Sequence, residues 1–366
     1  MKTGPFYFLQ AQAGGNMAEG AWGSAKGYTD ARTEHFAVRE KVGLIDFSSM
    51  GNLDIKGRDA KDALQRICVN DMDKLTVGKV LYTTVVNAEG GILDDTTVYM
   101  LADGHYMMVT STAKRFATLK YLLDHARGKD VFVTDITGGT GIMCLQGPAS
   151  VGLINSIADS PIDELKYFFF KKLKIAGNEV LVSRTGFTGS RGYELFVSGE
   201  DCFEVWKAVL GAGGEFGLQL CGSQVAAATL PLEKGYLSGR ELTESSNPFE
   251  LGLGWTVALD KAVPCVANDA LKKIKERGPA NRLVGFVMPD KAMTVANGTP
   301  VTSGGAEIGR VTSAAFGWYL DRFIGMAYIR SEYAALGGSI TVASAGGPVD
   351  VEIVDKVFFD PERKQL

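Results

Sequence analysis

The chain has 366 residues, of which 46% are hydrophobic and 22% charged, and its formal net charge is −4. This size and balance are typical of a globular protein with two or three domains. The charge provides no basic surface for nucleic acid or for an anionic membrane, and no apolar run approaches the 18 residues of a membrane-spanning helix. We therefore expect a cytoplasmic protein whose partners include neither nucleic acid nor a membrane.

The cysteines and histidines form no recognisable metal or disulfide pattern. The five cysteines are widely separated and odd in number, and none forms a Cys-x-x-Cys pair. The three histidines (His35, His105 and His125) show no ligand spacing. A Gly-x-Ser-x-Gly elbow and a Walker loop are also missing from the sequence. We therefore predict no metal, and neither serine-type hydrolysis nor P-loop phosphoryl transfer.

The first 140 residues alternate helices with short strands, although residues 1–30 give no firm assignment. Apolar periodicity predicts helices over 29–42, 58–67 and 114–126. Alternating or β-branched runs predict strands over 44–47, 53–55, 80–86, 92–100, 106–109 and 131–134. This order is typical of an α+β arrangement rather than of repeated βαβ units.

The remainder of the chain ends in a run of short strands. Before residue 278 we predict strands over 143–146, 181–184, 193–197 and 255–257. Helices are predicted over 202–210, 223–233 (interrupted near Pro231) and 271–277, and a glycine-rich loop over 211–214. After Gly278-Pro279, strands are predicted over 283–287, 307–311, 324–329 and 339–342. Their regular spacing indicates a small all-β C-terminal domain.

Two adjacent carboxylates, Asp94 and Asp95, follow the Gly90-Gly91 turn at the start of a predicted strand. Successive side chains on a strand point to opposite faces, so the two carboxylates cannot both face the same way. A carboxylate that faces inward must be paired or used. The alternative is that both residues only terminate a hairpin, and these residues alone leave the two interpretations open.

Five motifs carry a resemblance to a known family: GLIDFSSMG at 43–51, GGILDD at 90–95, LQGP at 145–148, SRTGFTG at 183–189 and NPFELG at 247–252. In this order they resemble the aminomethyltransferase (glycine cleavage T-protein) family of tetrahydrofolate-dependent enzymes. The resemblance extends over about residues 30–358.

The resemblance implies a three-domain cloverleaf with mixed and antiparallel sheets and a folate channel at its centre. Residues 1–52 together with 140–245 would form a discontinuous first folate-binding domain. Residues 53–139 would form a second α+β domain that carries the catalytic aspartate. Residues 246–280 would be a linker with a helical segment, and residues 281–366 a β-barrel-like domain.

The same resemblance assigns roles to individual side chains. Asp95 resembles the catalytic carboxylate beside the reactive folate nitrogen. Glu194 resembles the pterin-binding carboxylate, a role that suits a group able to accept two N–H donors. Five further residues match positions of cofactor contacts: Tyr82, Met50, Tyr167, Lys172 and Tyr236.

Departures from the family pattern concern the donor side of the site. Ser49 stands where the family has His, Phe187 and Phe168 stand where it has Tyr, Ala227 stands near a family Arg, and Thr110 near an Asn. We expect Phe187, Phe168, Ser49 and Ala227 to line the substrate pocket. The loss of a cation and of polar groups favours a less polar donor. The sequence therefore predicts a demethylase that moves a methyl group from a small O-, S- or N-methyl compound to N5 of tetrahydrofolate.

Other functions in the same superfamily stay open. The first is a true glycine-cleavage aminomethyltransferase, which would take its aminomethyl group from a lipoyl carrier protein. The second is a non-catalytic folate-binding protein of the iron–sulfur maintenance type, whose cysteine-bearing element the segment KGYLSGRE at 234–241 matches in length but without the cysteine. The third is a folate domain that works with an oxidase partner. The donor of a demethylase could be an aryl ether, a sulfonium compound or a methylamine.

Overall fold

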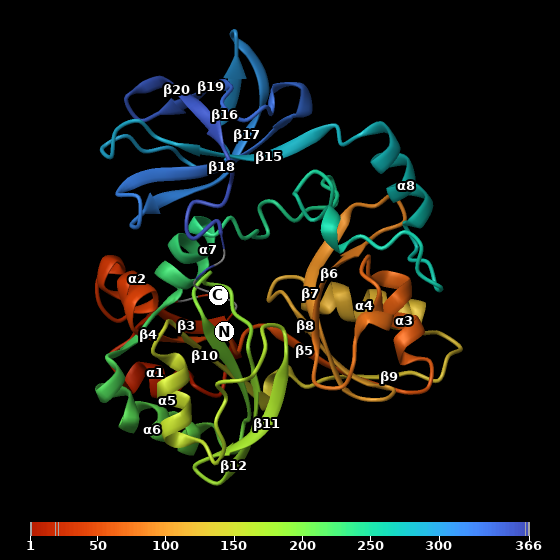
Figure 1. The fold of residues 1–366 in the computed structure, drawn as a ribbon, viewed down its shortest axis with the longest axis vertical. Coiled ribbons are helices and arrows are strands. Elements are labelled where there is room, and N and C mark those ends of the chain that lie inside the picture. The colour runs from red at the N-terminus through yellow and green to blue at the C-terminus, as the bar shows by residue number, and fades with distance from the viewer. Residues whose placement is uncertain (1, 19, 21, 363, 365–366) are drawn as a thin grey trace.

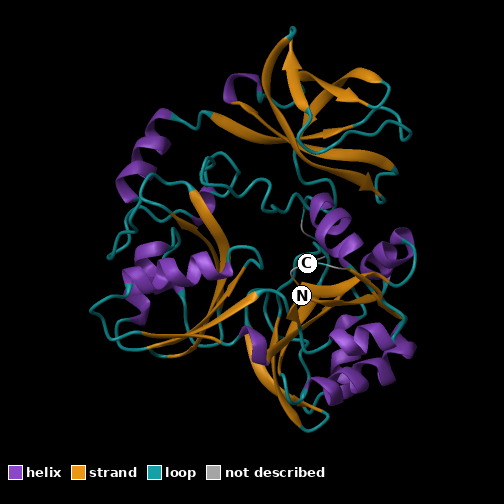
Figure 2. Cartoon of the chain, turned by 180° about the vertical axis from the view of Figure 1, so that it is seen from behind, coloured by secondary structure: helices purple, strands orange, loops and turns teal. Residues whose placement is uncertain are grey.

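The computed structural model describes residues 2–18, 20, 22–362 and 364, which form three lobes around a common centre (Figure 1). The chain begins and ends near this centre. In the first two lobes, helices lie on the outer sides and strands lie toward the middle (Figure 2). The predicted α+β cloverleaf with a C-terminal all-β domain is confirmed.

The first lobe is built on a mixed six-stranded sheet of order β11-β12-β13-β10-β4-β14. Its strands are β4 (Val42–Asp46), β10 (Thr140–Gln146), β11 (Phe170–Ile175), β12 (Asn178–Ser183), β13 (Gly192–Ser198) and β14 (Leu218–Leu220). The helices of this lobe are α1 (Tyr7–Gln12), α2 (Ala31–Glu40), α5 (Ser150–Ile157) and α6 (Cys202–Gly213). A small sheet of order β1-β3-β2 is formed by β1 (Lys2–Thr3), β2 (Asn16–Ala18) and β3 (Trp22–Gly27).

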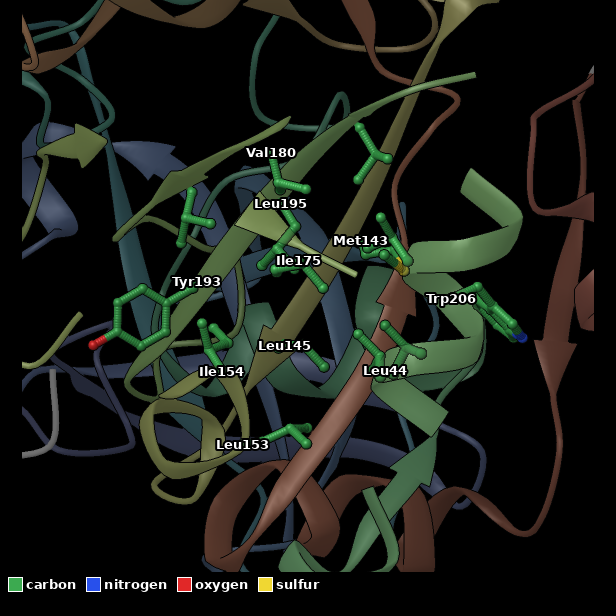
Figure 3. Packing of buried hydrophobic residues seen from close by; sticks show 14 of the residues in the cluster. Leu44, Met143, Leu145, Leu153, Ile154, Ile175, Val180, Tyr193, Leu195 and Trp206 are labelled. Carbon is green, nitrogen blue, oxygen red and sulfur yellow. The ribbon is translucent and has the colours of Figure 1, made fainter. Parts of the chain in front are cut away.

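Strand alternation divides the residues of this sheet between two faces. Met143, Leu145, Tyr193 and Leu195 share a hydrophobic core cluster with Trp206 of α6 (Figure 3). Their neighbours in sequence point to the opposite face, because side chains alternate along a strand. That opposite face is directed toward the second lobe.

The second lobe is a five-stranded antiparallel sheet of order β6-β7-β8-β5-β9, with helices α3 (Ala60–Ile67) and α4 (Arg115–His125). Its strands are β5 (Gly51–Lys56), β6 (Val80–Val86), β7 (Ile92–Ala102), β8 (His105–Thr110) and β9 (Phe132–Asp135). Tyr99 of β7 lies in a buried cluster with Cys144, Phe170 and Phe196 of the first lobe. The two sheets therefore share a core between them.

The third lobe is a closed barrel of order β15-β18-β17-β16-β19-β20. Its strands are β15 (Asn281–Val287), β16 (Pro300–Ser303), β17 (Ala306–Gly317), β18 (Arg322–Arg330), β19 (Ser339–Ser344) and β20 (Gly347–Val354). Helix α8 (Asn268–Arg277) leads into it. We retain the predicted domain boundaries as a proposed division of the chain.

Three local predictions are wrong. The predicted loop over 211–214 is the end of α6 followed by a 3-10 turn. Glycine suits the helical position 213, because a Cβ there would lie 2.3 Å from the side chain of Leu218. The predicted strand over 255–257 is a 3-10 turn over Gly254–Thr256. The predicted helix over 223–233 divides into a π-helix over Val225–Thr229 and α7 (Leu230–Glu233). Pro231 lies in the first turn of α7, where a missing N–H costs little.

Candidate active site

Asp94 and Asp95 point to opposite faces of β7. Asp94 is 2% exposed and faces α4, where its Oδ2 accepts a 2.7 Å hydrogen bond from Thr118 Oγ1. Its Oδ1 accepts a 3.0 Å hydrogen bond from the backbone N–H of Asp95. Burial raises the pKa of Asp94 to about 6. Asp94 therefore fastens β7 to its covering helix.

Asp95 lies on the face of β7 that looks toward the first lobe. Its Oδ2 accepts a 3.1 Å hydrogen bond from the phenol of Tyr82 on β6. Burial, and next the nearby charge of Asp94, raise the pKa of Asp95 to about 7. The pKa of Tyr82 also rises, through burial and the Asp95 charge, so its phenol stays protonated and remains a donor. The ring of Tyr82 stacks on Trp255, with centroids 6.1 Å apart.

Glu194 occupies the middle of β13 and is surrounded by hydroxyl and thiol donors. It accepts hydrogen bonds from Thr185 Oγ1, from Tyr99 OH at 3.4 Å and from Cys144 Sγ at 3.8 Å. Burial raises its pKa. Among the residues that the structure describes, no lysine, arginine or histidine forms an ion pair with Glu194 or Asp95.

One strand face connects the two carboxylates. Asp95 and Tyr99 are four residues apart on β7, so they lie on the same face and are separated by about 13 Å of extended chain. Tyr99 then reaches across to Glu194 of the first lobe. The result is a pair of partly buried carboxylates that face the space between the first two lobes and that form no ion pair with the part of the chain described.

The other predicted cofactor contacts are distributed unevenly. Met50 packs against the buried cluster that contains Tyr99. Tyr167 meets Phe168 edge to face, with centroids 4.7 Å apart, and Phe168 has a left-handed φ of 61°. Lys172 is exposed on β11 and pairs with the exposed Glu179 at 2.7 Å, so the structure does not bring its amine to Asp95 or Glu194.

The predicted pocket residues fall into two groups. Phe187 stacks on Tyr236, with centroids 5.5 Å apart, and both line a cavity of about 120 Å³ together with the exposed Ala227. Ser49 lies elsewhere, with its hydroxyl 3.0 Å from Thr112 Oγ1. Phe168 likewise does not line this cavity.

The cavity lies between the first lobe and the barrel. Besides those three residues, its walls are Ala228, Pro231, Leu232, Ser238, Arg240, Asn297, Ser313, Ala314, Ala315 and Met326. Leu232 and Met326 of the cavity wall belong to the hydrophobic cluster against which Tyr82 packs. The cavity wall and Tyr82 therefore share one hydrophobic cluster.

Sequence reasoning missed four residues that contact the carboxylates or their partners: Tyr99, Thr185, Cys144 and Trp255. Tyr99 had a usable signal, because a residue four positions after Asp95 on a strand shares its face. Trp255 had no such signal, since its segment was predicted to be a strand.

In the described part of the chain, no three His, Cys, Asp or Glu side chains group as metal ligands. All the helices described are too short or too polar to cross a bilayer.

Two family models together match most of the chain. The model described as GCVT N-terminal domain matches residues 6–261, and the glycine cleavage T-protein C-terminal barrel domain matches residues 281–360. An aminomethyltransferase of Halothermothrix orenii is 36% identical over 360 residues, covering 98% of this chain and all of that protein. An aminomethyltransferase of Bacillus pumilus is also 36% identical, covering 98% of this chain and 99% of the relative.

A solved structure has the same overall fold. The glycine cleavage system aminomethyltransferase T of Bartonella henselae superimposes with a TM-score of 0.90, at 24% sequence identity and with 98% of both chains covered. At this identity the likeness concerns the fold alone.

Proposed function

Because this chain belongs to the glycine cleavage T-protein family, we propose that it transfers a one-carbon group to tetrahydrofolate, as an aminomethyltransferase does. The observation that carries the proposal is the pair of partly buried carboxylates, Asp95 and Glu194, on two facing sheets, which no cation of the described residues pairs. Buried carboxylates need hydrogen-bond donors, and a pterin edge offers N–H groups. The predicted demethylase is therefore our second candidate rather than the first.

Glu194 suits the pterin-binding role. Its donors in the folded chain are hydroxyls and a thiol, which can rotate or give way to N–H donors of a ligand. Because no cation neutralises it in the described part of the structure, a ligand that donates N–H groups would relieve the cost of its burial. Glu194 would hold the ring edge, while Tyr99 fixes the orientation of the carboxylate.

Asp95 suits proton handling at the reacting end. Tetrahydrofolate supplies a nucleophilic nitrogen, N5, to the transfer. Tyr82 occupies Oδ2 of Asp95, which leaves Oδ1 to accept a hydrogen bond or a proton. With a pKa near 7, the carboxyl can accept and return a proton at neutral pH. In its ionised form it also stabilises positive charge that develops nearby.

A transfer assay tests aminomethyl as the transferred group. The protein is mixed with tetrahydrofolate and a lipoyl carrier protein loaded with aminomethyl, and ammonia release is followed together with the formation of a methylene-bridged folate. The proposal expects both products in equal amounts, and a strong loss of both in Asp95→Asn. Calorimetric titration with tetrahydrofolate accompanies the assay, and absence of binding by the wild-type protein would contradict the proposal.

A specific feature of the cavity favours methyl transfer as the second candidate. Ala227 and Ala228 are exposed on its wall beside Phe187, so this part of the wall is apolar. A small methyl compound would meet an apolar surface there. In the same assay, methyl donors would then yield 5-methyl-tetrahydrofolate without ammonia, whereas the loaded carrier would yield neither product.

A further inference from the structure

We propose that Arg240 binds the carboxylate of a small one-carbon donor in the cavity between α7 and the barrel. The inference rests on the second candidate of the proposed function, methyl transfer from a small compound, because it takes this cavity as the donor side of such a transferase. It adds a substrate class, a small carboxylic acid, and a residue that selects it.

Arg240 is the charged residue of the cavity wall. The other wall residues are apolar, aromatic, hydroxyl-bearing or amide side chains. The guanidinium of Arg240 is exposed, and within the described ranges no hydrogen bond or ion pair engages it. A guanidinium presents a planar set of N–H donors that matches a carboxylate in a bidentate pair. The wall therefore holds a cation whose natural partner is absent from the neighbouring protein groups.

The turn that carries Arg240 is held by hydrogen bonds within itself and to the barrel. Glu241 Oε2 accepts 2.8 Å hydrogen bonds from the backbone N–H and the hydroxyl of Ser238. Glu241 Oε1 accepts a 2.6 Å hydrogen bond from Ser313 of β17. Both oxygens of the adjacent carboxylate are thus occupied, and the turn is fixed to the barrel. A position held in this way preorganises Arg240 for a ligand and lowers the entropic cost of binding.

The cavity has the size of a small molecule. Its volume of about 120 Å³ is close to that of an engineered cavity, about 150 Å³, that holds benzene. Tyr236, on the same wall, stacks on Phe187, and Leu232 and Met326 of this wall belong to the cluster against which Tyr82 packs. A donor with its carboxylate at Arg240 would therefore place its other end against Phe187 and Tyr236.

Matched probes test the charge requirement. Methoxyacetate and N-methylglycine are each compared with the alcohol in which a hydroxymethyl group replaces the carboxylate, by NMR titration of the full chain. We expect the acids to bind more tightly than the alcohols. Arg240→Gln should weaken the acids about 10- to 100-fold and leave the alcohols unchanged. Arg282→Gln, which removes another exposed arginine outside the cavity, is the matched control.

Two outcomes overturn the inference. The first is that the wild-type protein binds the acids and the alcohols with equal affinity, or that Arg240→Gln binds the acids as well as the wild type does. In the second case the variant and the wild type should have equal melting temperatures, which shows that the variant is folded. The second comes from titration with tetrahydrofolate and with tetrahydropteroate, which lacks the glutamate. A loss in Arg240→Gln that is confined to tetrahydrofolate would assign Arg240 to the carboxylates of the folate instead.

The inference and the proposed function can fail separately. If the wild-type protein binds the acids through Arg240 but does not bind tetrahydrofolate, the carboxylate site stands and the proposed function fails. If it binds tetrahydrofolate, with a loss in Glu194→Ala, but discriminates no acid from its alcohol, the donor inference fails alone.

Discussion

The phenol of Tyr82 donates a 3.1 Å hydrogen bond to Asp95 across the neighbouring strands β6 and β7. The two residues are offset by two positions in the register, since Thr84 lies opposite Asp95 and Thr97 opposite Tyr82. Diagonal neighbours on one sheet face lie within reach of a long aromatic side chain. This pairing fixes one oxygen of Asp95 and leaves the other to a ligand.

The first prediction concerns Asp95→Asn. We expect the rate of one-carbon transfer to fall about 10²- to 10⁴-fold, because the amide cannot take the proton. The folded carboxyl has a pKa of about 7, against about 3.9 in an unfolded chain, so the unfolded state loses its proton first as pH rises. Wild-type stability should therefore decrease between about pH 4 and pH 7, and the variant should be more stable above pH 7 by about 1 to 3 kcal/mol.

Chemical unfolding at several pH values measures this difference. Asp103→Asn, at an exposed position in the turn between β7 and β8, is the matched control and should change neither rate nor stability. Full turnover by Asp95→Asn would remove Asp95 from the mechanism.

The second prediction separates Asp94 from Asp95. The charge of Asp94 contributes to the raised pKa of Asp95, so Asp94→Asn should lower that pKa. If the ionised form of Asp95 acts, the rate decreases below its pKa, and this decrease should move to lower pH in the variant. The pH dependence of kcat/KM for tetrahydrofolate measures it. An unchanged midpoint in a folded Asp94→Asn protein would contradict the coupling.

Much of the sheet architecture was predictable because its signals are local. Period-two alternation predicted β6 with both boundaries, and β7 from its first residue to residue 100. The same alternation predicted that Asp94 and Asp95 face opposite ways. That Asp94, rather than Asp95, faces α4 is linked to its hydrogen bond with Thr118, 24 residues further along the chain. No local pattern encodes this contact. The Tyr99–Glu194 contact joins positions 95 residues apart on different lobes.

The wrong local predictions have a similar origin. Gly213 occurs within a glycine-rich run, which resembles a loop, but the approach of Leu218 requires a helical residue without a side chain. Trp255 belongs to an apolar triplet typical of a strand, whereas its ring is 67% exposed and stacks on Tyr82. For Trp255 a contact with a distant strand outweighs the local preference, whereas at Gly213 the contact comes from Leu218 at the start of the next strand, β14.

The third prediction concerns tetrahydrofolate affinity. Glu194→Gln should weaken binding about 10- to 100-fold, because a neutral amide replaces a charged acceptor and presents N–H groups to a ligand edge that also donates. Glu179→Gln removes an exposed carboxylate of the neighbouring strand β12 and should leave the affinity unchanged. Isothermal calorimetry distinguishes the two variants, and equal affinities would refute the pterin-binding role of Glu194.

The fourth prediction uses Trp255 as a reporter. Its indole is largely exposed and stacked beside the Tyr82–Asp95 pair, whereas Trp206 is 5% exposed in the core of the first lobe. A ligand that reaches Asp95 should change the environment of Trp255 and quench its fluorescence. Trp255→Phe should abolish most of the quenching, and Trp206→Phe should not. Quenching that persists in Trp255→Phe would place the folate elsewhere.

The last prediction concerns a buried polar network that joins the first lobe to the barrel. Glu233 Oε2 accepts hydrogen bonds from Arg39 Nη2 at 2.9 Å, while His35 Nε2 lies 3.0 Å from the same oxygen. Glu233 Oε1 accepts from the backbone N–H of Tyr319 at 2.9 Å, and its carbonyl accepts from Phe359. One residue, through its side chain and its backbone carbonyl, thus connects α2, α7, a barrel loop and the C-terminal segment.

Replacement of Glu233 by Gln should therefore destabilise the protein by about 3 to 5 kcal/mol, because it leaves the buried Arg39 without a counter-charge.

The pH dependence of the stability has a definite sign. Burial lowers the pKa of His35 despite the opposing effect of Glu233, so below about pH 6.5 the unfolded chain binds a proton that the folded chain does not. Wild-type stability should therefore decrease as pH falls through this range, and His35→Gln should make the decrease shallower. Urea unfolding from pH 5 to pH 8 measures both effects. Glu332→Gln, which breaks an exposed pair with Arg330, should cost less than about 1 kcal/mol. A cost as small for Glu233→Gln would show that the network contributes little to holding the barrel on the first lobe.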